Sequence, residues 1–163
     1  MKLKREYFKS FVFGVEDSLV STVGLLSGVA LAGIASQTVI LTGIVLIFVE
    51  AFSMAAGEFL SERSTEEFVA QKEVTTSKPV IASGVMFVSY LVSGFIPLSP
   101  YFFLPSQTAL PYSVGAALCA LFILGAVGAR VTKTHFLKRG VQMLVIGGAA
   151  IAVGILAGQI AGV

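Results

Sequence analysis

Three side chains able to bind a metal ion stand one helical turn apart in a stretch of the chain that is otherwise almost wholly apolar. Glu50, Met54 and Glu58 lie between Leu41 and Leu60, and side chains four residues apart share one face of a helix. A carboxylate at the centre of a membrane-spanning helix costs about 3 kcal/mol or more. Two carboxylates and a thioether on one stripe therefore indicate a coordination site inside a membrane.

A fourth candidate ligand, Asp17, stands in the apolar stretch that precedes this one. The connection between the two stretches, Gly33–Gln37, is so short that their helices are expected to form an antiparallel hairpin. Counted from the expected helix ends at about 1.5 Å per residue, Asp17 lies level with Met54 and Glu58, and Glu50 lies one turn deeper. We therefore expect Asp17 to face the Glu50–Met54–Glu58 stripe.

The ligand types restrict the metals that such a site would suit. Carboxylate oxygens favour hard divalent cations, and a thioether adds a softness that Mg²⁺ and Ca²⁺ do not use, whereas Cu⁺ prefers more sulfur. The mixture points to first-row ions such as Fe²⁺, Mn²⁺, Co²⁺ or Zn²⁺. Buried carboxylates also favour their protonated form, so protons and metal would compete, and Glu50, the deepest acid, is the candidate for proton coupling. Weak oxygen ligation is typical of a transporter, which must release what it binds.

Each of these residues also has an ordinary structural interpretation. Glu58 lies near enough to the end of its apolar stretch for its carboxylate to reach the membrane surface. Met54 taken alone would be a core residue that fills space. Glu16, next to Asp17, would face lipid headgroups or pair with a basic residue. These alternatives stay open at the level of the sequence.

A polar segment, residues 62–78, follows the acidic stripe and separates two apolar stretches. We expect it to continue the second helix into the cytosol for a few turns and to end near residues 75–77. Glu62, Glu66 and Glu67 stand within it, with Glu62 and Glu66 one turn apart. They form either a patch that captures metal ions in the cytosol or a solvated helix face.

Glycines repeat at four-residue spacing in the first and last apolar stretches, as Gly24 and Gly28 and as Gly154 and Gly158. Small residues at this spacing let two helix backbones approach closely in lipid. The alternative is that the glycines of the first stretch line a narrow path beside Asp17.

The composition indicates the environment of the whole chain. Of its 163 residues, 56% are hydrophobic and 12% are charged, and the mean hydropathy is +0.93, whereas soluble domains carry about 25% charged residues. No charged residue occurs in 18–49, 79–129 or 140–163, and a membrane-spanning helix needs about 20 apolar residues. We therefore predict an all-α, multi-pass membrane protein with a single transmembrane domain and five helices, at about residues 11–33, 38–61, 79–96, 109–129 and 140–160.

The positions of the basic residues predict the orientation in the membrane. All eleven Lys and Arg residues lie before residue 10, within 63–78 or within 130–139. Cytoplasmic segments carry an excess of Lys and Arg, so we expect the N-terminus in the cytosol and the C-terminus outside. The net charge of +2 then reflects topology rather than binding of nucleic acid. The sequence lacks the E-x-x-H and H-E-x-x-H metal motifs of enzymes, and we expect no enzymatic activity and no cofactor.

Two segments resemble the vacuolar iron transporter family. Residues 17–28, DSLVSTVGLLSG, are similar to the D-G-L-V-S-T opening of its first helix, with Ser18 in place of glycine, and residues 53–61, SMAAGEFLS, are similar to the S-M-A-A-G-E-Y end of its second helix. The likeness extends in order over essentially the whole chain. It implies a five-helix protomer that dimerises, with an ion path between the protomers lined by the first helices. It also implies export of Fe²⁺, and often Mn²⁺, from the cytosol in exchange for protons, with Asp17 and Met54 as ligands.

The chain departs from this family pattern at two places. Residues 62–78 stand where well-studied members carry a longer metal-binding domain rich in Glu and Met, and Leu46 stands where some members carry a glutamate, whose role Glu50 would take. We predict a homodimeric antiporter that exchanges Fe²⁺ or Mn²⁺ for protons. The alternative is a passive cation channel or a regulatory membrane subunit with the same fold. The small size predicts a prokaryotic plasma membrane, or a vacuolar or other organelle membrane in a eukaryote.

Overall fold

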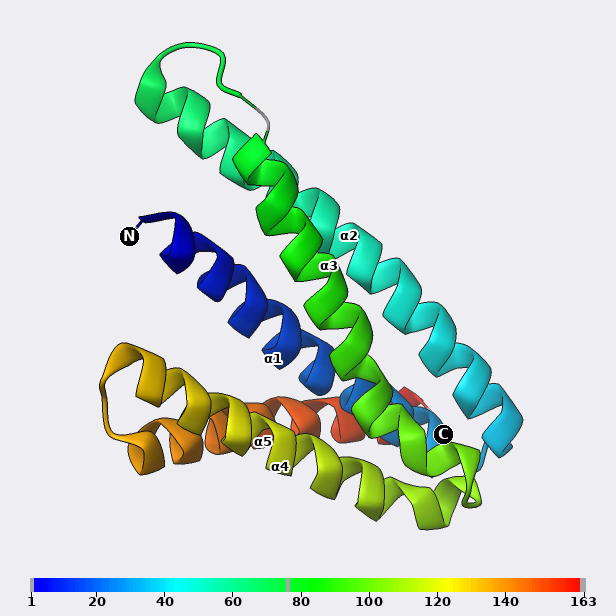
Figure 1. The fold of residues 1–163 in the computed structure, drawn as a ribbon. Coiled ribbons are helices and arrows are strands. Elements are labelled where there is room, and N and C mark those ends of the chain that lie inside the picture. Colours follow the sequence, from blue (N-terminus) through cyan, green and yellow to red (C-terminus); the bar gives the residue numbers. More distant parts are fainter. Residues whose placement is uncertain (1, 76, 162–163) are drawn as a thin grey trace.

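Five long helices account for most of the chain. The computed structural model describes residues 2–75 and 77–161, and within these ranges it contains no strand. Each of the five α-helices is long and apolar enough to cross a membrane, so the predicted all-α, multi-pass membrane fold is confirmed. The elements follow one another as α1 (Lys2–Leu31), α2 (Ser36–Ala70), α3 (Ser77–Leu98), the 3₁₀ helix η1 (Ser99–Phe102), α4 (Ser106–Thr132) and α5 (Phe136–Ala161) (Figure 1).

The helices extend beyond the ends predicted from the apolar runs. α1 begins at Lys2 rather than near residue 11, and α2 continues past Ser61 to Ala70. Lys, Arg and Glu are good helix formers, so a helix does not have to stop where its apolar run stops. The expected extension of the second helix is confirmed, but it ends earlier than residues 75–77, because Gln71 adopts a left-handed conformation with φ of 51°.

The helices alternate in direction, so three polar segments lie at one end of the bundle. These are the N-terminal part of α1, the α2–α3 connection and the α4–α5 connection (Figure 1), and together with the adjoining helix ends they hold all eleven Lys and Arg residues. We call this the basic end. The opposite end holds the α1–α2 turn, η1 and the last turn of α5, and it contains no charged residue. That the basic end faces the cytosol stays a prediction.

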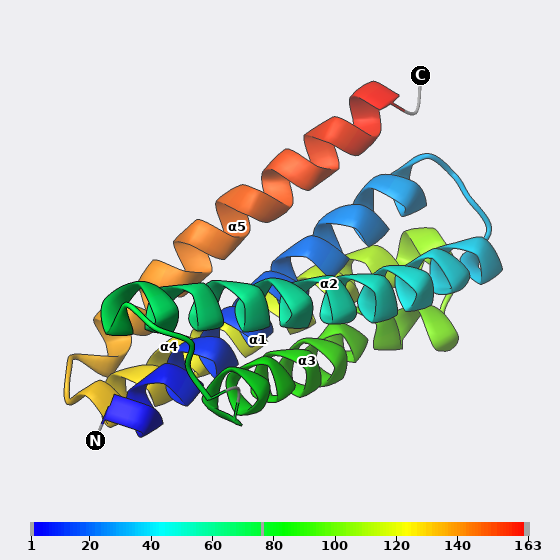
Figure 2. The ribbon, with the colours of Figure 1, turned by 90° about the horizontal axis from the view of Figure 1, so that it is seen from above.

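α1 is the central helix of the bundle and packs against each of the other four. α2 and α3 lie on one side of it, and α4 and α5 lie on the other (Figures 1 and 2). Leu26, Ile47 and Leu98 are buried in one cluster that joins α1, α2 and α3, and Val23 and Ile151 belong to a second cluster that also includes α4. Because lipid tails are as apolar as these side chains, close packing rather than exclusion of water holds the helices together.

Glycines make the closest contact between α1 and α5. A side chain at Gly154 would meet the backbone of Gly24, and a side chain at Gly158 would meet the backbone of Gly28. The two helix backbones therefore touch along one side of α1. This confirms the interpretation of the glycine spacing as a packing signal.

Replacement of Gly154 by alanine is expected to loosen this contact. The new Cβ would lie 2.7 Å from the Cα of Gly24, and a backbone atom cannot rotate away as a flexible side chain can. We expect a lower thermal midpoint in detergent, with a loss of about 1–3 kcal/mol in stability. Gly115→Ala in α4 is the matched control, since a Cβ there meets nothing within 4 Å. Equal midpoints for the two variants would contradict the close packing of α1 on α5.

Candidate functional site

The residues predicted to bind metal lie where α1 and α2 face each other, but not in the predicted register. Asp17 on α1 lies close enough to Glu50 on α2 for their charges to interact. Glu58 instead lies opposite Ser10, whose Oγ donates a hydrogen bond of 2.5 Å to Glu58 Oε1. Asp17 is therefore level with Glu50, and the expectation that it is level with Met54 and Glu58 is wrong.

The turn between the two helices explains this register. α1 ends at Leu31 and α2 begins at Ser36, so Asp17 and Glu50 are each fourteen residues from the turn. Equal counts give equal depth, because every residue of an α-helix adds about 1.5 Å along its axis. The sequence-based count started instead from the far ends of the two apolar runs, and the helices do not end there.

A furrow made of adjoining hollows follows α1 from near the basic end to the α1–α2 turn. It consists of three hollows with volumes of about 370, 180 and 660 Å³, counted from the basic end. The first and second hollows share Phe13 and Glu16, and the second and third share Val20 and Ala150. The third hollow reaches Ile34 in the α1–α2 turn. We call this feature the α1 furrow.

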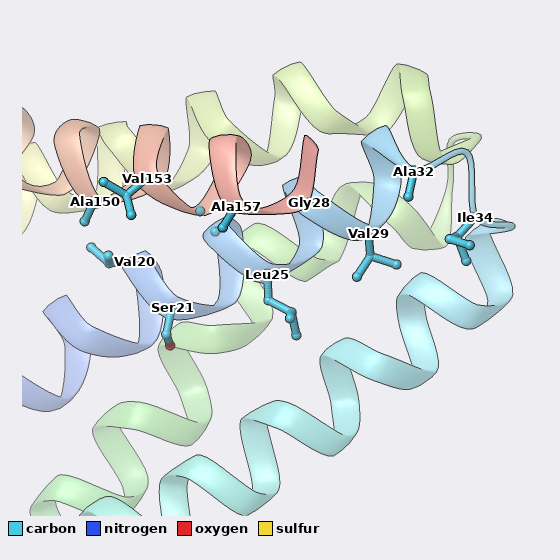
Figure 3. Close-up of a pocket in the computed structure, with 13 residues that line it drawn as sticks. Val20, Ser21, Leu25, Gly28, Val29, Ala32, Ile34, Ala150, Val153 and Ala157 are labelled. Atoms are coloured by element: carbon cyan, nitrogen blue, oxygen red, sulfur yellow. The ribbon is translucent and has the colours of Figure 1, made fainter. Parts of the chain in front are cut away.

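α5 forms one wall of the second and third hollows of the α1 furrow. Figure 2 shows α5 and α2 diverging from one another with α1 between them. In the widest hollow, Ala150, Val153 and Ala157 of α5 lie above the side chains of α1 (Figure 3). Glu16 and Asp17 line the middle hollow. Asp17 therefore lines the furrow and also lies within electrostatic reach of Glu50 on α2.

Met54 and Glu58 lie closer to the basic end than the acidic pair. Both are half-buried on the face of α2 that carries Glu50. The Ser10 side chain that binds Glu58 is fully buried, so this hydrogen bond ties α2 to α1 about two turns from Glu50. The structure thus places Asp17 and Glu50 at the same level and within electrostatic reach of each other, Glu58 at a separate level and Met54 between the two levels.

The acidic residues of the α2 extension are partly engaged in ion pairs. Glu66 lies 3.2 Å from Lys78, and Glu67 lies 2.9 Å from Arg63. Both pairs are partly exposed to solvent, where ion pairs are weak and a metal ion can compete. In the part of the chain that the structure describes, no group of three or more His, Cys, Asp or Glu side chains could hold a metal ion. Capture of metal by Glu62, Glu66 and Glu67 stays a prediction.

Sequence reasoning missed two hydroxyl groups beside the acidic pair. Tyr90 on α3 is fully buried, and its hydroxyl lies 2.6 Å from Ser21 Oγ on α1. The phenol lies within electrostatic reach of both Asp17 and Glu50. Ser21 was detectable, because it stands one turn beyond Asp17 on the same helix face. Tyr90 was not, because no spacing within one segment predicts that α3 packs on this part of α1.

Comparison with known proteins identifies relatives over most of the chain. Residues 8–76 and 67–159 match the sequence profile of the VIT family. The chain is 29% identical to "Vacuolar iron transporter homolog 3" of Arabidopsis thaliana, over 92% of this chain and 80% of that protein. It is 26% identical to "VIT-like transporter 1b" of Glycine max, over 92% and 74%. A match to "Vacuolar iron transporter 1" of Tulipa gesneriana reaches 30% identity over 53% of this chain and 37% of that protein.

Pairs of introduced cysteines would test the register of α1 against α2. In a Cys119→Ser background, Asp17→Cys with Glu50→Cys is expected to be cross-linked in high yield by a short thiol-reactive reagent. Asp17→Cys with Glu58→Cys is the matched pair and is expected to react poorly, because position 58 lies eight residues, or about 12 Å, further along α2. Mass spectrometry of the linked peptides gives both yields. A higher yield for the second pair would restore the register that the structure rejects.

Proposed function

The chain belongs to the VIT family, and we propose that it transports divalent metal ions across a membrane. The proposed substrate is Fe²⁺ and/or Mn²⁺, exported from the cytosol in exchange for protons. The observation that carries this proposal is the pair of carboxylates on facing helices, Asp17 and Glu50, which lie at the same level and within electrostatic reach of each other, with Asp17 lining the α1 furrow. The names of the relatives, which describe vacuolar iron transporters and a VIT-like transporter, support iron as the substrate.

The two acidic side chains are suited to bind a cation, because their negative charges are unfavourable when no cation is present. Two charged carboxylates within electrostatic reach repel one another, and an uncompensated charge in the interior of a membrane is costly. A divalent cation held between Asp17 and Glu50 removes the repulsion and supplies the opposite charge. Met54, one turn from Glu50 on the same face of α2, adds a soft sulfur ligand that suits Fe²⁺ and Mn²⁺ better than Mg²⁺. Glu58, two turns from Glu50, would meet the ion before the pair does.

A second copy of the chain would complete the pathway. The α1 furrow is open along its length, and α2 and α5 diverge on either side of it (Figure 2). A two-fold axis parallel to the helices would place the furrows of two protomers face to face, and each ligand would then occur twice. The proposed homodimer thus provides two Asp17 carboxylates and two Met54 sulfurs around one closed path. The metal is the substrate of this path, and the proposal includes no enzymatic step and no resident cofactor.

The distribution of charge supports the proposed direction. With the basic end in the cytosol, as the positive-inside rule favours, Glu58, Met54 and the acidic pair line the cytosolic half of the path. Beyond the pair, neither α1 nor α2 carries another charged residue before their turn. Ions would therefore be bound from the cytosolic side and released through a part of the path that holds them weakly.

The host membrane is the last part of the proposal. Two of the relatives carry the word vacuolar in their names, which supports an organelle membrane over the prokaryotic plasma membrane predicted from the sequence. The ligands and the path are the same in either setting, because both membranes separate the cytosol from a second compartment.

A passive cation channel, or a regulatory subunit that retains the fold, is the alternative function. The short α2 extension favours it, since the two ion pairs engage Glu66 and Glu67 and leave fewer free acids to collect metal ions. A channel moves metal down its own gradient at a rate independent of the proton gradient. An antiporter moves metal faster when protons flow down their own gradient in the opposite direction. Measuring metal transport with and without a proton gradient therefore distinguishes the two functions.

Removal of either proposed ligand is expected to stop transport. In proteoliposomes with a proton gradient, Asp17→Ala and Met54→Ala should each reduce Fe²⁺ and Mn²⁺ uptake to near background, because the proposed path loses a carboxylate or a sulfur ligand. Glu73→Ala, in the α2–α3 connection, and Met143→Ala, on α5, are the controls for the two substitutions. Wild-type uptake by Asp17→Ala or Met54→Ala, with both chains assembled, would contradict the proposed path.

Glu50→Gln is expected to uncouple metal transport from proton movement. The amide keeps the shape of the side chain but cannot carry a proton in exchange for the metal. A pH-sensitive dye inside the vesicles should report metal-dependent proton movement for the wild type and little for Glu50→Gln. Glu73→Gln controls for the loss of one carboxylate at an exposed position. Undiminished proton movement in Glu50→Gln would remove Glu50 from the coupling mechanism.

A further inference from the structure

A pair of hydroxyl groups extends the acidic site toward the uncharged end of the bundle. The Tyr90 hydroxyl and Ser21 Oγ lie 2.6 Å apart, and Tyr90 is within electrostatic reach of Asp17 and Glu50. Ser18 fixes the backbone of the tyrosine, because its Oγ donates a hydrogen bond of 2.6 Å to the carbonyl oxygen of Tyr90. Two contacts from α1 therefore hold this one residue of α3 in place.

Ser21 differs from the other described residues that line the third hollow of the α1 furrow. Among the described residues that line the widest hollow, only Ser21 has a polar side chain, and the others are apolar side chains or glycines. Figure 3 shows Ser21 on α1 at the end of this hollow where Val20 and Ala150 also lie, and these two residues are shared with the hollow that contains Asp17. Ser21 is therefore the first residue with a polar side chain beyond Asp17 along the furrow.

The hydroxyl pair has two arrangements that suit two states of the site. Each hydroxyl has one proton to donate and lone pairs that accept, and either oxygen can be the donor within the pair. When Tyr90 donates to Ser21, the Ser21 proton is free to bind a carboxylate that has no metal. When Ser21 donates to Tyr90, the lone pairs of Ser21 are free to bind a cation.

We propose that Ser21 is a neutral ligand that accepts the metal ion from Asp17 and Glu50 on its way along the α1 furrow, and that Tyr90 is the positioning residue that orients the Ser21 hydroxyl. This inference rests on the transport function proposed above. A divalent cation that moved directly from two carboxylates to an apolar hollow would lose all of its protein ligands at once. A hydroxyl oxygen lowers that barrier, and because it is uncharged it does not trap the ion.

The test compares maximal rate with apparent affinity. Tyr90→Phe and Ser21→Ala are each expected to lower the maximal rate of Fe²⁺ or Mn²⁺ transport by about tenfold, the size of one hydrogen bond to a charged group. The metal concentration at half-maximal rate should stay near the wild-type value, since Asp17 and Glu50 still capture the ion. Because the two residues act through one hydrogen bond, the double variant should be no slower than either single variant.

Tyr101→Phe and Ser83→Ala are the matched controls for the two substitutions. Tyr101 is a second fully buried tyrosine, located in η1 at the uncharged end, and Ser83 lies on α3 with its hydroxyl bound to the carbonyl of Val80. Both are expected to transport at the wild-type rate. The thermal midpoint of every variant, measured in the same detergent, reports any loss of folded protein, and rates are expressed per assembled dimer.

The possible outcomes separate this inference from the function on which it rests. A wild-type maximal rate in Tyr90→Phe, with Asp17→Ala inactive, overturns the role of the hydroxyl pair and leaves the transport function intact. A weaker apparent affinity at an unchanged maximal rate also overturns it, because the pair would then belong to the capture site. Equal losses in Tyr90→Phe and Tyr101→Phe would show a structural effect. Absence of metal transport by the wild type in every gradient overturns both proposals.

Discussion

The short turn between α1 and α2 is the constraint from which the site follows. It leaves four residues between the last residue of α1 and the first of α2, so the two helices run antiparallel as neighbours and their register is fixed from that end. Asp17 and Glu50 are equally far from the turn, at a depth of about 21 Å. In a hydrocarbon core about 30 Å thick, this depth lies past the middle and nearer the basic end. One additional helical turn of residues, either between Asp17 and the connection or between the connection and Glu50, would shift one carboxylate along the helix axis away from the other.

Different faces of α1 pack against different neighbours, and one face lines the furrow. One side carries Leu26 into the core with α2 and α3, and another presents Gly24 and Gly28 to α5 at backbone contact. The glycines hold α5 against one side of α1. The strip of α1 between α5 and α2 therefore stays uncovered. The same glycines thus fix the helix packing and leave the furrow open, so the packing and path-lining interpretations of their spacing are compatible.

The sequence predicts those features that depend on local composition. Five apolar runs predict five helices, and the positions of Lys and Arg predict which helix ends lie together. The start of α1 was predicted too late because charged residues such as Lys2 are good helix formers outside the membrane, whereas the extension of α2 past Ser61 was expected and only its end near residues 75–77 was wrong. The level of Asp17 was wrong because it was counted from the far ends of the apolar runs rather than from the turn. Tyr90 was missed because its importance depends on α3 packing against α1, a contact between segments almost seventy residues apart.

The acidic pair is difficult to explain as a structural feature alone. A buried carboxylate that serves folding is normally paired with a basic residue, because an uncompensated buried charge is costly. No Lys or Arg occurs between Ser10 and Glu62, and the neighbour whose charge acts on Asp17 is a second acid. Two like charges at this depth destabilise the fold unless protons or a cation neutralise them. The acidic pair therefore favours the proposal that a cation from outside the chain completes the site, and the hollow beside Asp17 is the route proposed for that cation.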